Sequence, residues 1–219
     1  AGDSVIYLCF TTGIAGTFNA ANIAKETLLE EYPEFDLTII DSKCASIGFG
    51  LVVSKLVTML EHGASKEKLI EAADYYITHV HHVFTVHTLA YLIKGGRLTK
   101  FKGTLAETLD MKPILIVDGN GALAVIKTVR GRKKSLKYLV EYAKENSSVM
   151  EGAAVALCHG EDKESRDFML SMIEQEIHPG EVLVGTVGCA IGAHTGRGLI
   201  GFCFFDADDG KYQRYFESV

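Results

Sequence analysis

The first forty residues restrict the possible folds more than any other part of the chain. Two short apolar runs, Val5–Phe10 and Leu37–Ile40, flank the segment Thr17–Tyr32, in which apolar residues recur at helical spacing. Short apolar runs of this kind are typical of parallel strands that are buried on both faces. A strand, a helix and a strand of these lengths predict a βαβ unit, so we expect an α/β protein.

Strands and helices also alternate along the rest of the chain. The further strands that we expect are 81–86, 113–117, 122–128, 155–158, 182–186 and 200–205. The further helices that we expect are 47–62, 65–77, 88–94, 102–109, 132–145 and 163–176. The run Asp118-Gly-Asn-Gly121 is typical of a hairpin turn. The sequence therefore predicts a three-layer α/β protein with two lobes, a mostly parallel lobe over residues 1–80 and a mixed-sheet lobe over residues 81–219.

Composition indicates a globular chain and argues against several classes of function. Hydrophobic residues make up 47% of the 219 residues and charged residues 23%. A formal charge of −6 argues against a nucleic-acid surface, and no apolar run reaches the roughly 18 residues of a membrane helix. The five cysteines form no C-x-x-C pair, and no signal peptide is recognisable. We expect a cytoplasmic protein with reduced thiols, no metal site and no stable membrane insertion.

A pair of hydroxyls follows the first strand. Thr11, Thr12 and Gly13 lie between that strand and the helix. Ligands of open α/β sheets bind at this position, where the N–H groups at the start of the helix are free. A threonine hydroxyl can donate to a carboxylate there. The alternative is that Thr12 or Thr17 caps the helix.

A glycine-rich segment, 188–201, lies between the last two expected strands and carries His194 and Thr195. Glycine lets a ligand or another backbone approach closely. A histidine, with an ordinary pKa near 6.5, can donate a hydrogen bond to a carboxylate. The segment predicts a turn that grips a small polar group, although a tight turn with an incidental histidine fits the same residues.

Five motifs, in this order, resemble the DegV family of bacterial fatty-acid-binding proteins. They are Thr11–Asn19, Asp41-Ser42-Lys43, Gly95-Gly96-Arg97, Lys112-Pro113-Ile-Leu115 and Gly192-Ala-His194-Thr-Gly196. The resemblance extends from about residue 3 to about residue 206. It implies a two-lobed α/β carrier, without catalytic residues or cofactor, that buries a long-chain fatty acid and presents its carboxylate to a separate fatty acid kinase.

The resemblance also assigns roles to individual residues. It implies that the fatty-acid carboxylate is held by four side chains: Thr11, Thr12, His194 and Thr195. It implies that four glycines shape the loops around the ligand: Gly13, Gly16, Gly192 and Gly196. Thr11 and Thr12 replace the serine pair of the family, Ala15 stands where the family often has serine, and Arg197 stands where it commonly has proline.

Members of the resembled family carry several dozen more residues before the first strand of this chain, including a Thr-Ser-Gln-Pro-Ser loop. That region has no counterpart in the sequence. We therefore expect the chain to be a fragment, or its missing part to lie in another chain, so contacts from that region are not assigned.

One basic stretch stands out in this acidic chain. It consists of Lys127, Arg130, Arg132, Lys133, Lys134 and Lys137. The stretch is either the solvated start of a helix or a docking patch for an acidic partner. The resemblance favours the patch, with Arg130 and Arg132 contacting the kinase.

Two further interpretations concern the histidines. His79, His81, His82 and His87 lie close in sequence, but no carboxylate or cysteine accompanies them, and His81 and His82 would face opposite sides of a strand, so we expect no metal site. The alternative function is a dihydroxyacetone-kinase-like enzyme or carbonyl-binding subunit, in which His194 would bind a small carbonyl compound covalently. A fatty acid that co-purifies with the protein would favour the carrier.

Overall fold

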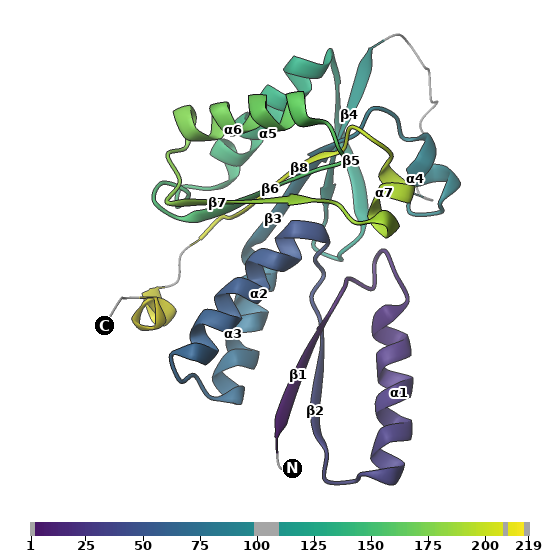
Figure 1. Cartoon of the computed structure of the whole chain (residues 1–219), viewed down its shortest axis with the longest axis vertical. Coiled ribbons are helices and arrows are strands. Elements are labelled where there is room, and N and C mark those ends of the chain that lie inside the picture. The colour runs from purple at the N-terminus through teal and green to yellow at the C-terminus, as the bar shows by residue number, and fades with distance from the viewer. Residues whose placement is uncertain (1–2, 99–109, 208–209, 217–219) are drawn as a thin grey trace.

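The structure of the chain is a computed structural model that describes residues 3–98, 110–207 and 210–216. Its N-terminal part is the predicted βαβ unit. Strands β1 (Ser4–Cys9) and β2 (Asp36–Asp41) pair in parallel, and α1 (Thr17–Glu31) connects them. This unit projects from the rest of the molecule in Figure 1.

A six-stranded mixed sheet forms the centre of the molecule, in the order β5-β4-β3-β8-β6-β7. Its strands are β3 (Val80–Thr85), β4 (Met111–Val117), β5 (Leu123–Arg130), β6 (Ala154–His159), β7 (Glu181–Thr186) and β8 (Ile200–Phe205). Only β6 and β7 pair in parallel. The predicted hairpin joins β4 to β5, where the Asp118 carboxylate accepts hydrogen bonds from the N–H groups of Asn120 and Ala122 at 2.9 and 3.0 Å.

Helices cover both faces of this sheet and give three layers (Figure 1). The four covering helices are α2 (Ser46–Glu61), α3 (Lys66–His79), α5 (Arg132–Asn146) and α6 (Lys163–Glu176). Alternate residues of a strand point to opposite faces, so on β6 Leu157 packs in the core under α5 and α6, whereas Ala156 packs in the core with α2 and α3. Two short helices, α4 (Ala90–Lys94) and α7 (Cys189–Thr195), contact each other at one end of the sheet.

The predicted fold class is confirmed, with differences in detail. The glycine-rich segment is not a simple turn, because its residues 189–195 form helix α7, which Gly196 ends at φ 72°. A short 3₁₀ helix, η1 (Gly210–Tyr215), was not predicted. The helix expected over 102–109 lies outside the described residues. The lobe boundary at residue 80 stays a prediction: β3 begins there, yet α2 and α3 pack on the six-stranded sheet.

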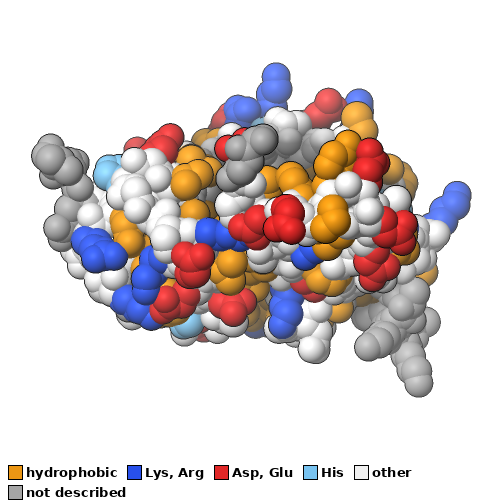
Figure 2. All heavy atoms as spheres, turned by 90° about the horizontal axis from the view of Figure 1, so that it is seen from below, with side chains coloured by type: hydrophobic (Ala, Val, Ile, Leu, Met, Phe, Trp, Pro, Cys, Tyr) orange, Lys and Arg blue, Asp and Glu red, His pale blue; other side chains and the backbone are white. Residues whose placement is uncertain are grey.

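The surface carries charges of both signs. Figure 2 shows acidic, basic and hydrophobic side chains interspersed over the face seen from below. Within the described ranges, no helix is both long enough and apolar enough to cross a bilayer.

Candidate functional site

An apolar cavity of about 470 Å³ lies between the loop after β1, the start of α2, the central sheet and the helix pair α4–α7. Its wall includes Phe10, Ile14, Phe84, Leu92, Leu123 and Leu199. Pockets for small ligands in proteins are about 300–1,000 Å³ in volume and are lined mainly by apolar side chains. The cavity therefore has the size and the lining to bury one elongated hydrophobic molecule.

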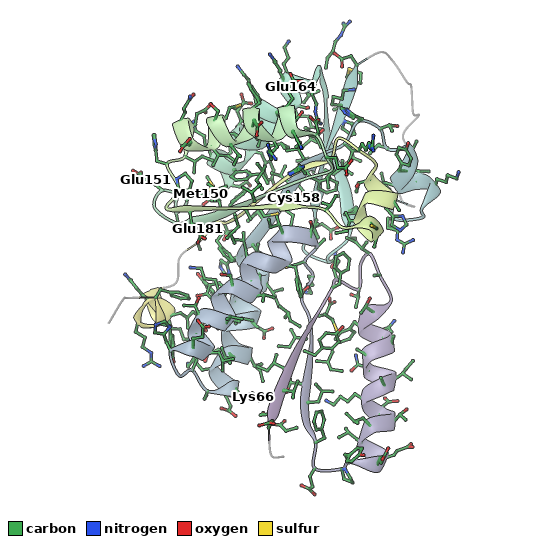
Figure 3. The ribbon with its side chains drawn as sticks, in the orientation of Figure 1. Lys66, Met150, Glu151, Cys158, Glu164 and Glu181 are labelled. Carbon is green, nitrogen blue, oxygen red and sulfur yellow. The ribbon has the colours of Figure 1, made fainter. Side chains whose placement is uncertain are left out.

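The central strands form the floor of this cavity. On β8, Gly201 lies between Phe84 of β3 and Cys158 of β6, and a Cβ at Gly201 would come within 2.8 Å of the Cys158 sulfur. Figure 3 shows Cys158 on the six-stranded sheet. Burial raises the pKa of the Cys158 thiol, and it raises that of Cys203 well above its usual range. Both thiols are therefore protonated and behave as apolar surface.

Six side chains with polar groups other than thiols line the cavity in the described part of the chain: Thr17, Ser46, His82, Arg97, His194 and Thr195. His194, in the last turn of α7, packs against the backbone of Gly95, directly after α4. Arg97 donates from Nη1 to the Gly95 carbonyl at 2.7 Å. Because both side chains contact Gly95, a guanidinium and an imidazole lie near each other in the wall of an apolar cavity. We call this pair, Arg97 and His194, the polar end.

The polar end can satisfy a carboxylate. Among the described residues, no Asp or Glu forms an ion pair with Arg97, so none of them neutralises its charge. A guanidinium and an imidazole both donate hydrogen bonds, and charge-assisted bonds to a carboxylate are the strong ones. His194 was a candidate from the sequence, whereas Arg97 was not. The Gly-Gly-Arg motif was the available signal, because its glycines let the chain pass closely beside α7.

The threonines after β1 are engaged elsewhere. The Thr11 hydroxyl donates to the Gly121 carbonyl at 2.9 Å. The Thr12 hydroxyl donates to the Asp41 carboxylate at 2.6 Å. Neither residue lines the cavity within the described part of the chain. Thr195 does line it, and its hydroxyl donates to the Ile191 carbonyl at 3.0 Å. The alternative in which a threonine caps α1 is wrong, because the N-cap residue is Gly16 and no side chain caps the helix.

The four glycines assigned to the ligand loops lie beside the cavity wall rather than in it. Gly13 approaches the Gly121 carbonyl so closely that a Cβ would collide with it, which ties the loop after β1 to the β4–β5 hairpin. Gly16 precedes α1, Gly192 lies inside α7, and Gly196 ends α7. These glycines set the course of the backbone around the site.

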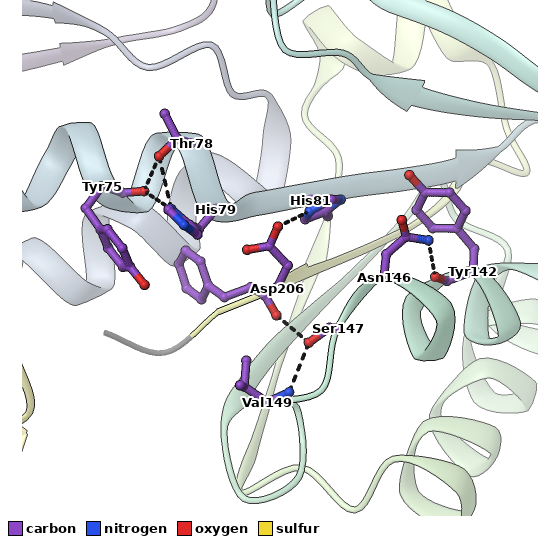
Figure 4. Close-up of polar contacts among 10 residues, drawn as sticks. Tyr75, Thr78, His79, His81, Tyr142, Asn146, Ser147, Val149 and Asp206 are labelled. Atoms are coloured by element: carbon purple, nitrogen blue, oxygen red, sulfur yellow. Dashed lines mark hydrogen bonds and ion pairs between the residues drawn. The ribbon is translucent and has the colours of Figure 1, made fainter. Parts of the chain in front are cut away.

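His82 is a buried member of the lining that the sequence analysis did not assign to the site. Its side chain is 6% exposed, and burial, with a smaller contribution from His81, lowers its pKa to about 4. His81 points to the other face of the sheet, where its Nε2 lies 2.7 Å from the Asp206 carboxylate (Figure 4). Its ring stacks on Phe204. In the described part of the chain, no three His, Cys, Asp or Glu side chains gather as metal ligands.

Arg130 and Arg132 lie in different surroundings. Arg130 is exposed at the end of β5. Arg132 is largely buried, and its Nη2 donates to the Asp162 carboxylate at 2.8 Å and to the Gly198 carbonyl at 2.7 Å. These bonds hold the loop after α7 against the start of α6. Arg132 therefore has a role inside the protein, whereas Arg130 faces solvent.

Comparisons with known proteins agree with this fold. A DegV domain-containing protein of Clostridium perfringens is 32% identical over 203 residues, which cover 93% of this chain and 70% of the relative. The crystal structure of a DegV family protein from Eubacterium eligens, loaded with heptadecanoic acid, has a TM-score of 0.85 and 28% identity, with 94% of this chain and 74% of that chain covered. A stearic acid-binding protein from Eubacterium ventriosum has a TM-score of 0.81 and 28% identity, with coverage of 97% and 72%. The DegV family model matches residues 1–207, and the chain belongs to the DegV family.

Proposed function

We propose that the protein binds a long-chain fatty acid in the apolar cavity and holds the carboxylate at the polar end. The observation that carries this proposal is that Arg97 and His194 lie near each other in a cavity whose remaining wall is mostly apolar. The heptadecanoic acid in one related crystal structure and the stearic acid-binding name of the other support it.

The two ends of such a ligand have opposite requirements. Each buried CH₂ group of the acyl chain contributes about 0.8 kcal/mol, so the hydrocarbon supplies most of the affinity. A buried carboxylate without partners is very costly, so it needs donors at the point where it enters the apolar wall. Arg97 supplies a permanent positive charge and His194 a second donor, while Thr195 contributes to the wall beside them.

We further propose that the protein is a carrier and not an enzyme, and that a fatty acid kinase phosphorylates the bound carboxylate. The family resemblance supports this role. The apolar lining is also a poor match for a three-carbon polar compound, which is the ligand of the alternative enzyme. The cytoplasmic location and the kinase partner stay predictions.

Ligand stabilisation tests the binding function. At 100 times its dissociation constant, heptadecanoic acid is expected to stabilise the folded protein by about 2.7 kcal/mol, measured by urea unfolding. Arg97→Ala and His194→Ala are each expected to weaken binding by about 1–3 kcal/mol, because each removes a hydrogen bond to a charged group. Arg197→Ala is the matched control, since the Arg197 side chain is 89% exposed and does not line the cavity.

Three outcomes separate the possibilities in this experiment. If fatty acid gives no stabilisation and dihydroxyacetone forms a mass adduct on His194, the carrier function is contradicted and the alternative enzyme function is supported. Wild-type affinity in both cavity variants would remove the polar end from the proposal. Thr12→Ala tests the sequence prediction separately, because the Thr12 hydroxyl donates to Asp41 and would have to change partner to hold a ligand carboxylate.

Kinase docking is expected to depend on Arg130 through its surface charge. Arg130→Ala should leave fatty-acid affinity intact and slow kinase-dependent phosphorylation several-fold at low ionic strength. The defect should shrink at high salt, because charges at the rim of an interface act mainly on the association rate. Arg132→Ala breaks the bonds to Asp162 and Gly198, so we expect a loss of stability as well. An unchanged phosphorylation rate for Arg130→Ala at low salt would exclude this docking role.

A further inference from the structure

The cavity has a second polar region, away from the polar end. His82 pairs with Cys203 across β3 and β8, whereas Thr85 and Ile200 form the pair at the end of the ladder next to α7. His82 is three residues before Thr85 along β3, which corresponds to roughly 10 Å. Ser46, at the start of α2, also lines the cavity, and α2 packs over His82 at Gly48. We call His82 and Ser46 the interior pair.

The His82 ring has a hydrogen-bond donor to spare. Its Nε2 accepts the Ala45 N–H at 3.4 Å, and the depressed pKa, about 4, keeps the ring neutral near pH 7. A neutral imidazole that accepts at Nε2 carries its proton at Nδ1. Within the described residues, no acceptor bonds that Nδ1–H. An imidazole in an apolar wall costs free energy unless its N–H group is hydrogen-bonded, so a cavity evolved only for hydrocarbon would be better lined by an apolar residue here.

The ring is also fixed in place. Gly48 lies so close to it that a side chain at this position would collide with Nε2. Ser46 adopts a φ of 51°, a conformation that is uncommon for residues other than glycine and is often retained at functional sites. The Ser46 hydroxyl interacts with the Cys158 thiol, a weak partner, and so has capacity for another hydrogen bond.

We propose that the preferred ligand is a hydroxy fatty acid, whose hydroxyl lies partway along the acyl chain and bonds to the interior pair. The Nδ1–H of His82 donates to the ligand oxygen, and the Ser46 hydroxyl is its second partner. This inference rests on the proposed function as a fatty-acid-binding protein and adds the class of fatty acid. A site that hydrogen-bonds a ligand hydroxyl discriminates against the analogue that lacks it, because the protein group is then left unpaired.

Calorimetric titration at pH 7 tests this inference. The probes are stearic acid and a series of hydroxystearic acids with the hydroxyl at successive positions along the chain. The wild-type protein is expected to bind at least one hydroxy isomer about tenfold or more tightly than stearic acid. In His82→Leu and in Ser46→Ala, the dissociation constant for stearic acid divided by that for the preferred hydroxy isomer is expected to fall toward one. His62→Leu, an exposed histidine at the end of α2, is the matched control and should keep the wild-type ratio.

The outcomes distinguish the two levels of the proposal. If stearic acid binds as tightly as every hydroxy isomer, the hydroxy-acid preference is overturned and the fatty-acid function stands. If no fatty acid binds, both are overturned. If a preference persists unchanged in both His82→Leu and Ser46→Ala, the interior pair does not cause it. Should His82→Leu fail to fold, the wild-type series and Ser46→Ala decide the question.

Discussion

Replacing Ala190 with tryptophan is expected to lower the affinity for long-chain fatty acids at least about 100-fold. Ala190 lies in α7, is exposed to solvent and lines the cavity, so its side chain is at the cavity entrance. An indole at this position would occupy volume that the acyl chain needs, and each CH₂ group kept out of the cavity forfeits about 0.8 kcal/mol. A 100-fold loss corresponds to about 2.7 kcal/mol, so about three or four excluded groups account for it.

The matched control is Ala193→Trp. Ala193 is also exposed on α7, but it does not line the cavity. This variant adds the same side chain to the same helix and should keep the wild-type affinity. Both variants should unfold at urea concentrations close to that of the unliganded wild-type protein. Wild-type binding by a folded Ala190→Trp would mean that the ligand does not pass α7.

Acid is expected to destabilise the unliganded wild-type protein more than a His82→Leu variant, by about 3 kcal/mol between pH 7 and pH 4. The folded-state pKa of His82 is about 4, against an ordinary value of 6.5. At pH 7 the residue is neutral in both the folded and the unfolded chain. Below pH 6.5 the unfolded chain takes up a proton that the folded chain does not, so stability falls until the pH reaches about 4. A difference of about 2.5 pKa units at about 1.4 kcal/mol each gives the expected magnitude.

Urea unfolding at several pH values measures this difference. Burial also lowers the pKa of His87 and of His159, so acid destabilises the folded protein through these two residues as well. They are present in both proteins, so their contribution cancels in the comparison. His62→Leu again serves as the control, since that histidine is exposed. Parallel pH profiles for the wild-type protein and His82→Leu would show that the buried imidazole is protonated as readily as an exposed one.

The local pattern of the sequence determined most secondary-structure elements and the fold class. Apolar periodicity placed α1 and α6, and the Asp-Gly-Asn-Gly run placed the β4–β5 hairpin, because turn chemistry and helical spacing act over a few neighbouring residues. Helix α7 was missed because glycine has a low intrinsic helix propensity, which tertiary packing against α4 overrides here. The order of the six strands was not available from the sequence, because it depends on pairings between distant segments.

The sequence also marked His194 as a candidate, through its glycine-rich surroundings, and this residue lines the cavity, but the sequence could not show which other side chains share the cavity with it. Arg97 joins His194 because α4 packs on α7 across nearly a hundred residues of chain. Thr12 does not line the cavity, and its hydroxyl donates a hydrogen bond to Asp41 of β2. His82 reaches the cavity because the β3–β8 register sets it opposite Cys203, with Gly48 of α2 above it. A motif fixes which groups are available, whereas the register and the packing of distant segments decide which of them share a cavity and which are already bonded elsewhere.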